Sequence, residues 1–137
     1  MKNLMPKVIE MFCKETGLNK KEQFKIKGLK EYDYCLDDDG LYCITNEIYH
    51  KFLLPLIRNE YKIKRKSQIL YRKTNCNIMP KVAEMVCEQY GLSKDILFTY
   101  NESPYVITNG GMFNGKYYVK SFISMIKGEA KIEREIE

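Results

Sequence analysis

The chain has 137 residues, of which 45% are hydrophobic and 30% charged, and 23 basic against 18 acidic side chains give a net charge of +5. This length is that of one ordinary domain or two very small ones, and the apolar content is sufficient for a packed core. The moderate positive charge allows an acidic partner but is far below that of a dedicated nucleic-acid coat.

The cysteine content indicates a reducing compartment. The cysteines are odd in number and include no C-x-x-C pair, unlike the frameworks of secreted domains. His50 is the only histidine, so a Cys/His zinc site has little support and we expect no cofactor. The sequence has no apolar run long enough for a membrane span and no secretory pattern, so we expect a cytoplasmic protein without membrane contact. The five cysteines are Cys13, Cys35, Cys43, Cys76 and Cys87.

Two segments of the chain have closely similar sequences. Residues 4–18 read LMPKVIEMFCKETGL and residues 78–92 read IMPKVAEMVCEQYGL, with nine identical positions. The match continues with gaps to the pair IRNEYKIKR (57–65) and IKGEAKIER (126–134). We interpret the chain as a tandem duplication, with copy one at 1–66, a basic linker at 67–76 and copy two at 77–137.

Both similar segments predict a helix. Their apolar residues recur at i, i+3, i+4 and i+7, which is the spacing of one helix face. A proline stands in the first turn, where its missing N–H costs nothing, and a Gly-Leu pair follows, as in a Schellman stop. The apolar positions are Met5, Val8, Ile9 and Phe12 in copy one and Met79, Val82, Ala83 and Val86 in copy two, with Gly17 and Gly91 at the stops.

The residues after each predicted helix favour β structure. Asn19 and Glu22 have the spacing of a capping box, which predicts a short helical turn. Alternating and β-forming residues then predict short strands, and Gly40 and the Asn114-Gly115 pair mark hairpin turns between them. A small antiparallel meander fits both copies. The expected strands lie at 24–27, 34–36, 105–108 and 116–119.

A second helix is expected in each copy, at 46–58 and at 121–127. Asn59 and Gly128 would end these helices, since both tolerate the left-handed conformation. Pro55 conflicts with a continuous helix in copy one. Closing strands are expected at 61–64 and at 130–133. The fold class is therefore α+β, with two tandem copies of a small helix–β-meander–helix–strand unit packed together.

Four constellations have a structural interpretation that we favour over a chemical one. The Asp37-Asp38-Asp39 run invites a metal site, but its counterpart in copy two, from Thr108 to Gly111, has no carboxylate, so a hairpin turn is the better interpretation. Asn109-Gly110-Gly111 could hold a phosphate, but glycine pairs are common in hairpins. His50 has no triad pattern around it, and Cys13 and Cys87 are expected to be buried, inert thiols.

The segment from Arg58 to Lys73 is the candidate binding site. It carries seven cations against one acid, Glu60, with tyrosines between them. Such a strip could follow a phosphate backbone, dock on an acidic protein surface, or be only a solvated face. Copy two lacks the basic end, so the strip is not a property of the repeated unit. The candidate residues are Arg58, Lys62, Lys64, Arg65, Lys66, Tyr71, Arg72 and Lys73.

The motifs of the unit resemble small accessory proteins of phages and mobile elements of low-GC Gram-positive bacteria. The matching segments are the M-P-K-V-x-E-M helix at 79–85, the Gly-Leu stop at 91–92, the hairpin at 105–110 and the I-x-G-E-x-K-I-E motif at 126–133. Proteins of this kind are often non-enzymatic inhibitors of host defence, including anti-CRISPR proteins, and some bind nucleotide signals. The resemblance brings no catalytic residue with it.

We therefore expect a non-enzymatic binding protein in the host cytosol that inhibits a defence system by protein–protein contact, in the manner of an anti-CRISPR protein. Its expected partner is a host protein or ribonucleoprotein complex. The alternative is a protein that binds nucleic acid or a nucleotide signal through the basic strip. An enzyme that uses a cysteine or the aspartate run is the least favoured hypothesis.

Overall fold

The protein is described by a computed structural model that covers residues 1–74, 76–132 and 134–135, with side chains described up to Ile132. It is an α+β structure with four helices and two antiparallel sheets in this described part. The chain divides into two compact units. The first unit is Met5–Ile78, and the second unit combines Met1–Leu4 with Met79–Glu137.

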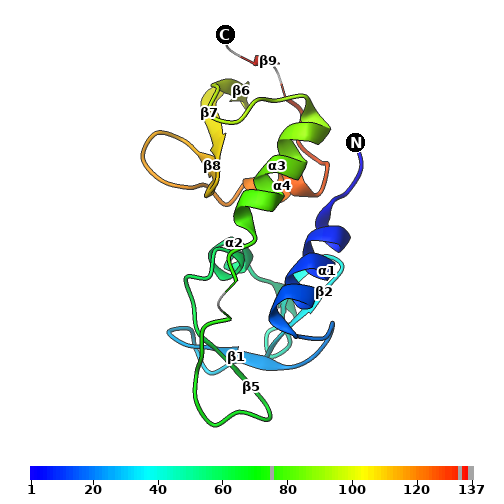
Figure 1. Ribbon diagram of the computed structural model, residues 1–137, viewed down its shortest axis with the longest axis vertical. Helices are drawn as coiled ribbons and strands as arrows, with labels where there is room; N and C mark the ends of the chain where they lie inside the picture. The colour runs from blue at the N-terminus through cyan, green and yellow to red at the C-terminus, as the bar shows by residue number, and fades with distance from the viewer. Residues whose placement is uncertain (75, 133, 136–137) are drawn as a thin grey trace. The chain divides into compact units, whose positions relative to one another are not determined.

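The first unit contains one long helix, one short helix and a five-stranded sheet (Figure 1). The strands follow the order β4-β3-β2-β1-β5, and each neighbouring pair is antiparallel. Helix α1 packs against β2 and β3. The elements are α1 (Met5–Thr16), β1 (Phe24–Ile26), β2 (Tyr34–Asp37), β3 (Gly40–Cys43), β4 (Ile48–Tyr49), α2 (Leu53–Ile57) and β5 (Ile63–Arg65).

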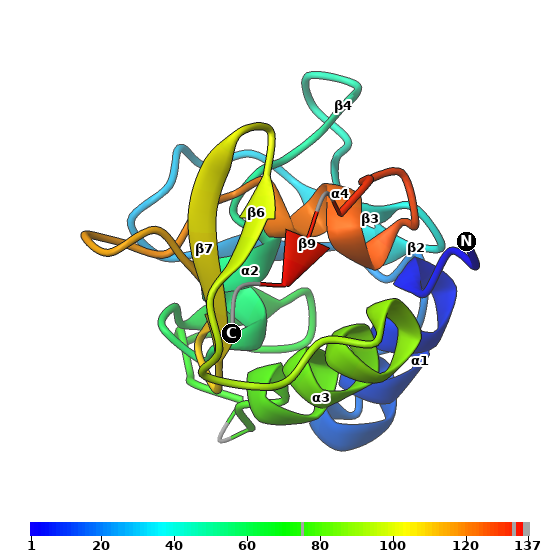
Figure 2. The same cartoon turned by 90° about the horizontal axis from the view of Figure 1, so that it is seen from above.

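The second unit has the same order of elements, with a long helix, strands, a short helix and a closing strand. Its strands follow the order β8-β7-β6-β9, of which β6 and β7 lie side by side in Figure 2. Helix α3 packs against β7 and β8. The elements are α3 (Met79–Tyr90), β6 (Phe98–Tyr100), β7 (Ser103–Thr108), β8 (Gly111–Phe113), α4 (Phe122–Ile126) and β9 (Arg134–Glu135).

Both long helices form where the apolar spacing predicts them, and each buries its predicted face. Gly17 and Gly91 follow their last turns with φ of 78° and 68°, a conformation in which a side chain would be strained. Burial of an aliphatic or aromatic side chain contributes about 1.5–3 kcal/mol, so these stripes anchor the units. The buried residues are Met5, Val8, Ile9 and Phe12 on α1 and Met79, Val82, Ala83, Val86 and Cys87 on α3.

The turn after each long helix differs from the expected helical turn. Lys21 and Asp95 have positive φ, 65° and 68°, so neither can continue a right-handed helix. Each instead donates its backbone N–H to a strand carbonyl of the same unit. Lys21 donates to the carbonyl of Leu36 at 2.8 Å, and Asp95 donates to the carbonyl of Ile107 at 2.9 Å. The turns therefore fix the helices to their sheets.

The second helix of the first unit is much shorter than the predicted 46–58. Glu47 has a φ of 57°, and Ile48 with the residue after it forms β4 against β3, so only Leu53–Ile57 is helical. Pro55 is the third residue of this helix, where no backbone N–H donor is required. The conflict between Pro55 and a long helix is thereby removed.

The second helix of the other unit, α4, lies within the predicted 121–127. Asn59 and Gly128 follow α2 and α4 with φ of 63° and 74°, as predicted for their stops.

Three expected segments are placed differently. The predicted strand at 116–119 is only an isolated bridge between Phe113 and Tyr118. The closing strand predicted at 61–64 is β5, two residues later, and the one predicted at 130–133 is replaced by β9, with Glu133 outside the described residues. No helix in the described part of the chain is long and apolar enough to cross a membrane.

Candidate binding surface

The chain folds back on itself after β5. Ile63 and Arg72 form an antiparallel bridge in which each backbone N–H donates to the other carbonyl, at 2.9 and 2.8 Å. At the turn, the backbone N–H of Gln68 donates to the Arg65 carbonyl at 2.9 Å. The side-chain oxygen of Gln68 accepts a hydrogen bond from the backbone N–H of Arg65 at 3.2 Å. We call residues 63–73 the basic loop. Part of the expected linker, 67–76, is thus an ordered return along β5.

The tip of the basic loop is apolar. Ile69 is 90% exposed and Leu70 is 64% exposed, whereas most large apolar side chains of the protein are buried. Lys66, Arg72 and Lys73 around them are also exposed. An aliphatic pair with a cationic rim has the composition of a contact site, with an apolar centre and charged surroundings.

Sequence reasoning missed Ile69 and Leu70. Their only sequence signal is an adjacent apolar pair inside a cationic segment without helical or strand periodicity. Without the fold, such a pair is equally compatible with a buried position.

Two of the predicted site residues have structural partners. Arg58 is only 15% exposed and its Nε lies 3.1 Å from Oε1 of Glu60. Arg65 binds Glu22, with 2.8 Å between Nη2 and Oε1. Neither guanidinium is available as a simple surface charge. The exposed candidates of the strip are Lys62, Lys66, Arg72 and Lys73.

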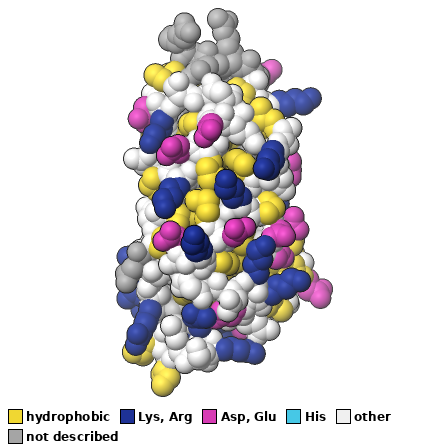
Figure 3. All heavy atoms as spheres, turned by 45° about the vertical axis from the view of Figure 1, so that its right-hand side comes forward, with side chains coloured by type: hydrophobic (Ala, Val, Ile, Leu, Met, Phe, Trp, Pro, Cys, Tyr) yellow, Lys and Arg dark blue, Asp and Glu magenta, His cyan; other side chains and the backbone are white. Residues whose placement is uncertain are grey.

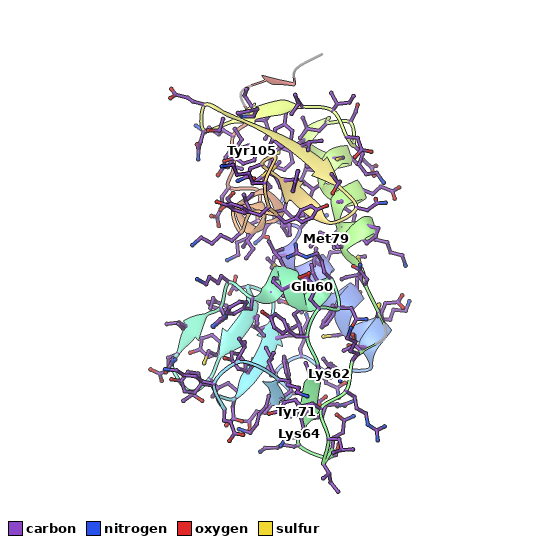
Figure 4. All side chains as sticks on the ribbon, turned by 90° about the vertical axis from the view of Figure 1, so that its left-hand side faces the viewer. Glu60, Lys62, Lys64, Tyr71, Met79 and Tyr105 are labelled. Carbon is purple, nitrogen blue, oxygen red and sulfur yellow. The ribbon has the colours of Figure 1, made fainter. Side chains whose placement is uncertain are left out.

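Lys64 and Tyr71 contact each other across the base of the loop. The Nζ atom of Lys64 lies 5.1 Å from the centre of the Tyr71 ring, within the range of a cation–π interaction (Figure 4). Both side chains are half-buried, while Lys62 is exposed. One face of the only tyrosine in the loop is therefore already occupied by a cation.

The carboxylate of Glu22 joins the basic loop to the turn after α1. Besides the Arg65 contacts, its Oε1 accepts a hydrogen bond from the Asn19 N–H at 3.1 Å, which is half of the predicted capping box. Partial burial alone would raise the pKa of Glu22, but the hydrogen bonds from Arg65 and Asn19 bring the pKa below its usual value. Glu22 is thus held ionised.

The aspartate run forms a hairpin turn, as predicted. Asp37 pairs with Gly40 between β2 and β3, and its Oδ1 accepts from the Asp39 N–H at 2.8 Å. The Tyr49 hydroxyl donates to Oδ2 of Asp37 at 2.7 Å, and this bond is the main reason why the pKa of Tyr49 is raised. Asp38 pairs with Lys20 at 2.6 Å. Within the described ranges, no three His, Cys, Asp or Glu side chains are grouped to hold a metal ion.

The hairpin of the second unit repeats this arrangement with a different polar group. The hydroxyls of Tyr118 and Thr108 lie 2.7 Å apart, and the Tyr118 ring covers Gly110. A Cβ at Gly110 would lie 2.4 Å from that ring, and the Gly110 N–H donates to Oγ1 of Thr108 at 3.0 Å. A phosphate therefore has little access to this loop, which supports the hairpin interpretation.

His50 occupies a structural position. The Nδ1 atom of His50 accepts from the Phe52 N–H at 3.2 Å, and the two rings stack at 4.6 Å. Burial, followed by the nearby Lys51 charge, lowers the pKa of His50.

Cys87 is buried as expected, but Cys13 is half-buried, so that expectation was only partly right. Burial raises the pKa of Cys13 above its usual value, although the charge of Lys20 acts in the opposite direction. Cys13 therefore lacks the depressed pKa of an activated nucleophile.

Charges elsewhere on the surface are mixed. On the face shown in Figure 3, Lys and Arg side chains are interspersed with Asp and Glu, with hydrophobic side chains between them.

Comparison with protein-family models, with curated proteins and with solved structures gives no match. The comparisons therefore add nothing to the assignment of function.

Proposed function

We propose that this protein is a non-enzymatic binding protein that contacts an acidic protein surface through the basic loop. The observation that carries the proposal is the exposure of Ile69 and Leu70, 90% and 64%, at the tip of an ordered cationic loop. Aliphatic side chains gain free energy only when a partner covers them. The bridge between Ile63 and Arg72 holds the loop in place, which reduces the entropy lost on binding.

A protein partner fits the tip better than a nucleic acid does. Binding of single strands uses aromatic rings on which bases stack, but Tyr71 is the only aromatic residue of the loop and carries Lys64 on its ring. Ile69 and Leu70 offer neither stacking nor hydrogen bonds. The cations then serve to attract and orient an acidic surface.

The proposal includes the tandem duplication. It is supported by the paired sequences, by the recurring turns at Lys21 and Asp95, and by the tyrosine contacts of Tyr49 and Tyr118. Features present in both units then belong to the fold. In the sequence, Glu133 and Glu135 of copy two stand where the basic loop has Lys64 and Lys66, so we take the positive charge of the loop as the feature that selection for binding would add.

The proposed partner class comes from the resemblance to phage accessory proteins. We propose a host defence complex, inhibited by occlusion and without turnover. The partner's binding site would combine an apolar depression for Ile69 and Leu70 with an acidic rim.

The test is affinity purification from host lysate with two matched variants. Ile69→Ser/Leu70→Ser removes the apolar tip, and Ile96→Ser/Leu97→Ser removes another exposed aliphatic pair, 41% and 48% exposed, outside the basic loop. We expect a protein partner to be retained by the parent chain and by the second variant, and lost with the first. The loss corresponds to roughly 100-fold in affinity, since two contact side chains contribute about 1.5 kcal/mol each.

Two results would contradict the proposal. One is equal recovery of the partner with both variants. The other is recovery of nucleic acid instead of protein, with a steep dependence on salt that phosphate contacts would produce.

A further inference from the structure

The first four residues of the chain belong to the unit that is formed by the second half. Met1–Leu4 clusters with residues from Met79 onward, although residue 5 begins α1 of the first unit. We call residues 1–4 the first arm. The corresponding residues before α3, which we call the second arm (76–78), belong to the first unit.

Both arms end on the same kind of hydrogen bond. Leu4 donates its backbone N–H to the carbonyl of Ile126, the last residue of α4, at 2.7 Å. Ile78 donates its N–H to the carbonyl of Ile57, the last residue of α2, at 3.1 Å. Leu4 and Ile78 are both buried. Each arm thus satisfies one carbonyl at the end of a short helix, where no partner exists within the helix.

The first arm is held along its backbone as well as at Leu4. The side-chain amide of Gln89 donates to the Lys2 carbonyl at 2.8 Å. Gly128 lies so close to the arm that a Cβ there would be 2.7 Å from the Lys2 oxygen and 2.8 Å from the Met1 oxygen. Met1 also lines a cavity of about 620 Å³ together with Tyr90 and Gly128.

The second residue after each short helix contacts the arm or the segment that leads to it. Gly128 leaves room for the backbone of residues 1 and 2, whereas Asn59 stands at the equivalent position in the first unit. The Oδ1 atom of Asn59 accepts from the Thr74 hydroxyl at 3.3 Å, just before the second arm. Gly128 therefore leaves space for the first arm because it has no side chain, whereas the side chain of Asn59 binds the segment before the second arm.

From these contacts we infer that the second unit contains a peptide-binding site, formed by the end of α4, Gly128 and Gln89, whose ligand is the first arm. The ligand class is an extended peptide with one aliphatic residue at the position of Leu4. Recognition rests on backbone carbonyls and one buried aliphatic side chain, so the arm of a second copy of this chain meets the same chemical requirements. The inference is independent of the proposed function.

Amide exchange in the full-length protein is the first test. Gly128→Ala places a methyl group against the arm, while Gly91→Ala imposes a similar backbone strain, at φ of 68° against 74°, with nothing within 4 Å of its Cβ. We expect the Leu4 amide to exchange about tenfold faster in Gly128→Ala, the factor for loss of one net hydrogen bond, and to stay protected in Gly91→Ala. A Leu4 amide that exchanges at the unprotected rate in the parent chain, or equally in both variants, would overturn the inference.

Binding in trans is the second test. A variant that begins at Met5 is titrated into a fluorescein-labelled peptide of residues 1–7, with a Leu4→Asp peptide as control. Saturable binding of the parent peptide alone, abolished by Gly128→Ala and retained with Gly91→Ala, is the expected result. Absence of binding to a variant that keeps the parent's circular dichroism contradicts the inference. If that variant does not fold, the exchange experiment decides.

Discussion

The guanidinium of Arg65 binds the carboxylate of Glu22, with Nη2 2.8 Å from Oε1 and a second contact from Nε to Oε2. Arg65 is the last residue of β5 and pairs with Phe24 of β1, two residues after Glu22. The ion pair therefore fixes the base of the basic loop to the sheet edge. A cation that the sequence places among the candidate binding residues therefore has a structural partner.

Replacing this carboxylate is expected to destabilise the protein. Glu22→Gln should lower the free energy of unfolding at pH 7 by about 1–2 kcal/mol, because charge-assisted hydrogen bonds to a partly buried group are lost. Chemical denaturation measures the change. The control is Asp38→Asn, which removes an exposed ion pair, 44% and 59% exposed, and should cost less than about 0.5 kcal/mol.

The pH dependence of the same variant follows from the lowered pKa of Glu22. The unfolded chain binds the proton more readily than the folded protein, so the stabilisation is present above the ordinary glutamate pKa and is lost as pH falls through the folded value. The difference between parent and Glu22→Gln should therefore shrink below about pH 4. A difference that stays constant down to pH 3 would show that the ion pair is not its origin.

His50 should make stability sensitive to mild acid. Its pKa is lowered in the folded protein, so its contribution is present above its ordinary value and is lost as pH falls through the folded one. Protonation would also remove the acceptor for the Phe52 N–H. We expect the parent chain to lose up to about 1 kcal/mol relative to His50→Asn between pH 7.5 and 5.5.

His50→Asn keeps an acceptor oxygen without a titrating proton and loses the stacking on Phe52 at every pH. Only the change with pH is therefore informative. Parallel stability curves for the two proteins would contradict the placement of His50.

The effects on stability of substitutions at Tyr118 and at Gly110 should depend on each other. Gly110→Ala brings a Cβ to 2.4 Å from the Tyr118 ring, and overpacking of this kind costs about 1–3 kcal/mol. In a Tyr118→Ala background the same substitution should cost much less. A double-mutant cycle by thermal unfolding measures this coupling, and additive effects of the two changes would contradict the contact.

The thiol of Cys13 should react with disulfide reagents more slowly than a free cysteine does. Its pKa is raised by burial, so the thiolate fraction near neutral pH is below that of a free cysteine. Reaction with an aromatic disulfide at pH 7.5, followed by mass spectrometry, should label Cys13 more slowly than cysteine in a short peptide. Faster labelling of Cys13 would revive the hypothesis of a catalytic thiol.

Local signals predicted much of the fold. The helices α1 and α3, their stops at Gly17 and Gly91, and the hairpin at Gly40 all depend on short-range spacing and on residues with unusual backbone freedom. Their placement required no knowledge of distant contacts. The same holds for the stops at Asn59 and Gly128.

The errors arose where distant pairing decided the structure. Residues 46–50 have a helix-compatible pattern, but Ile48 and its neighbour pair with β3, and α2 begins only at Leu53. The exchange of the two arms leaves no sequence signal, since Leu4 and Ile78 occupy equivalent places in the alignment. Exposure of Ile69 and Leu70 likewise depends on how the loop returns to β5.

The tip of the basic loop is the surface that we propose to contact a protein. A photo-crosslinking amino acid at position 69, compared with the same group at position 96, tests this contact most directly in living host cells or lysate. We predict one dominant crosslinked protein from position 69, with acidic residues around the crosslinked site, and none of it from position 96. Crosslinks to nucleic acid, or the same protein from both positions, would contradict the claim.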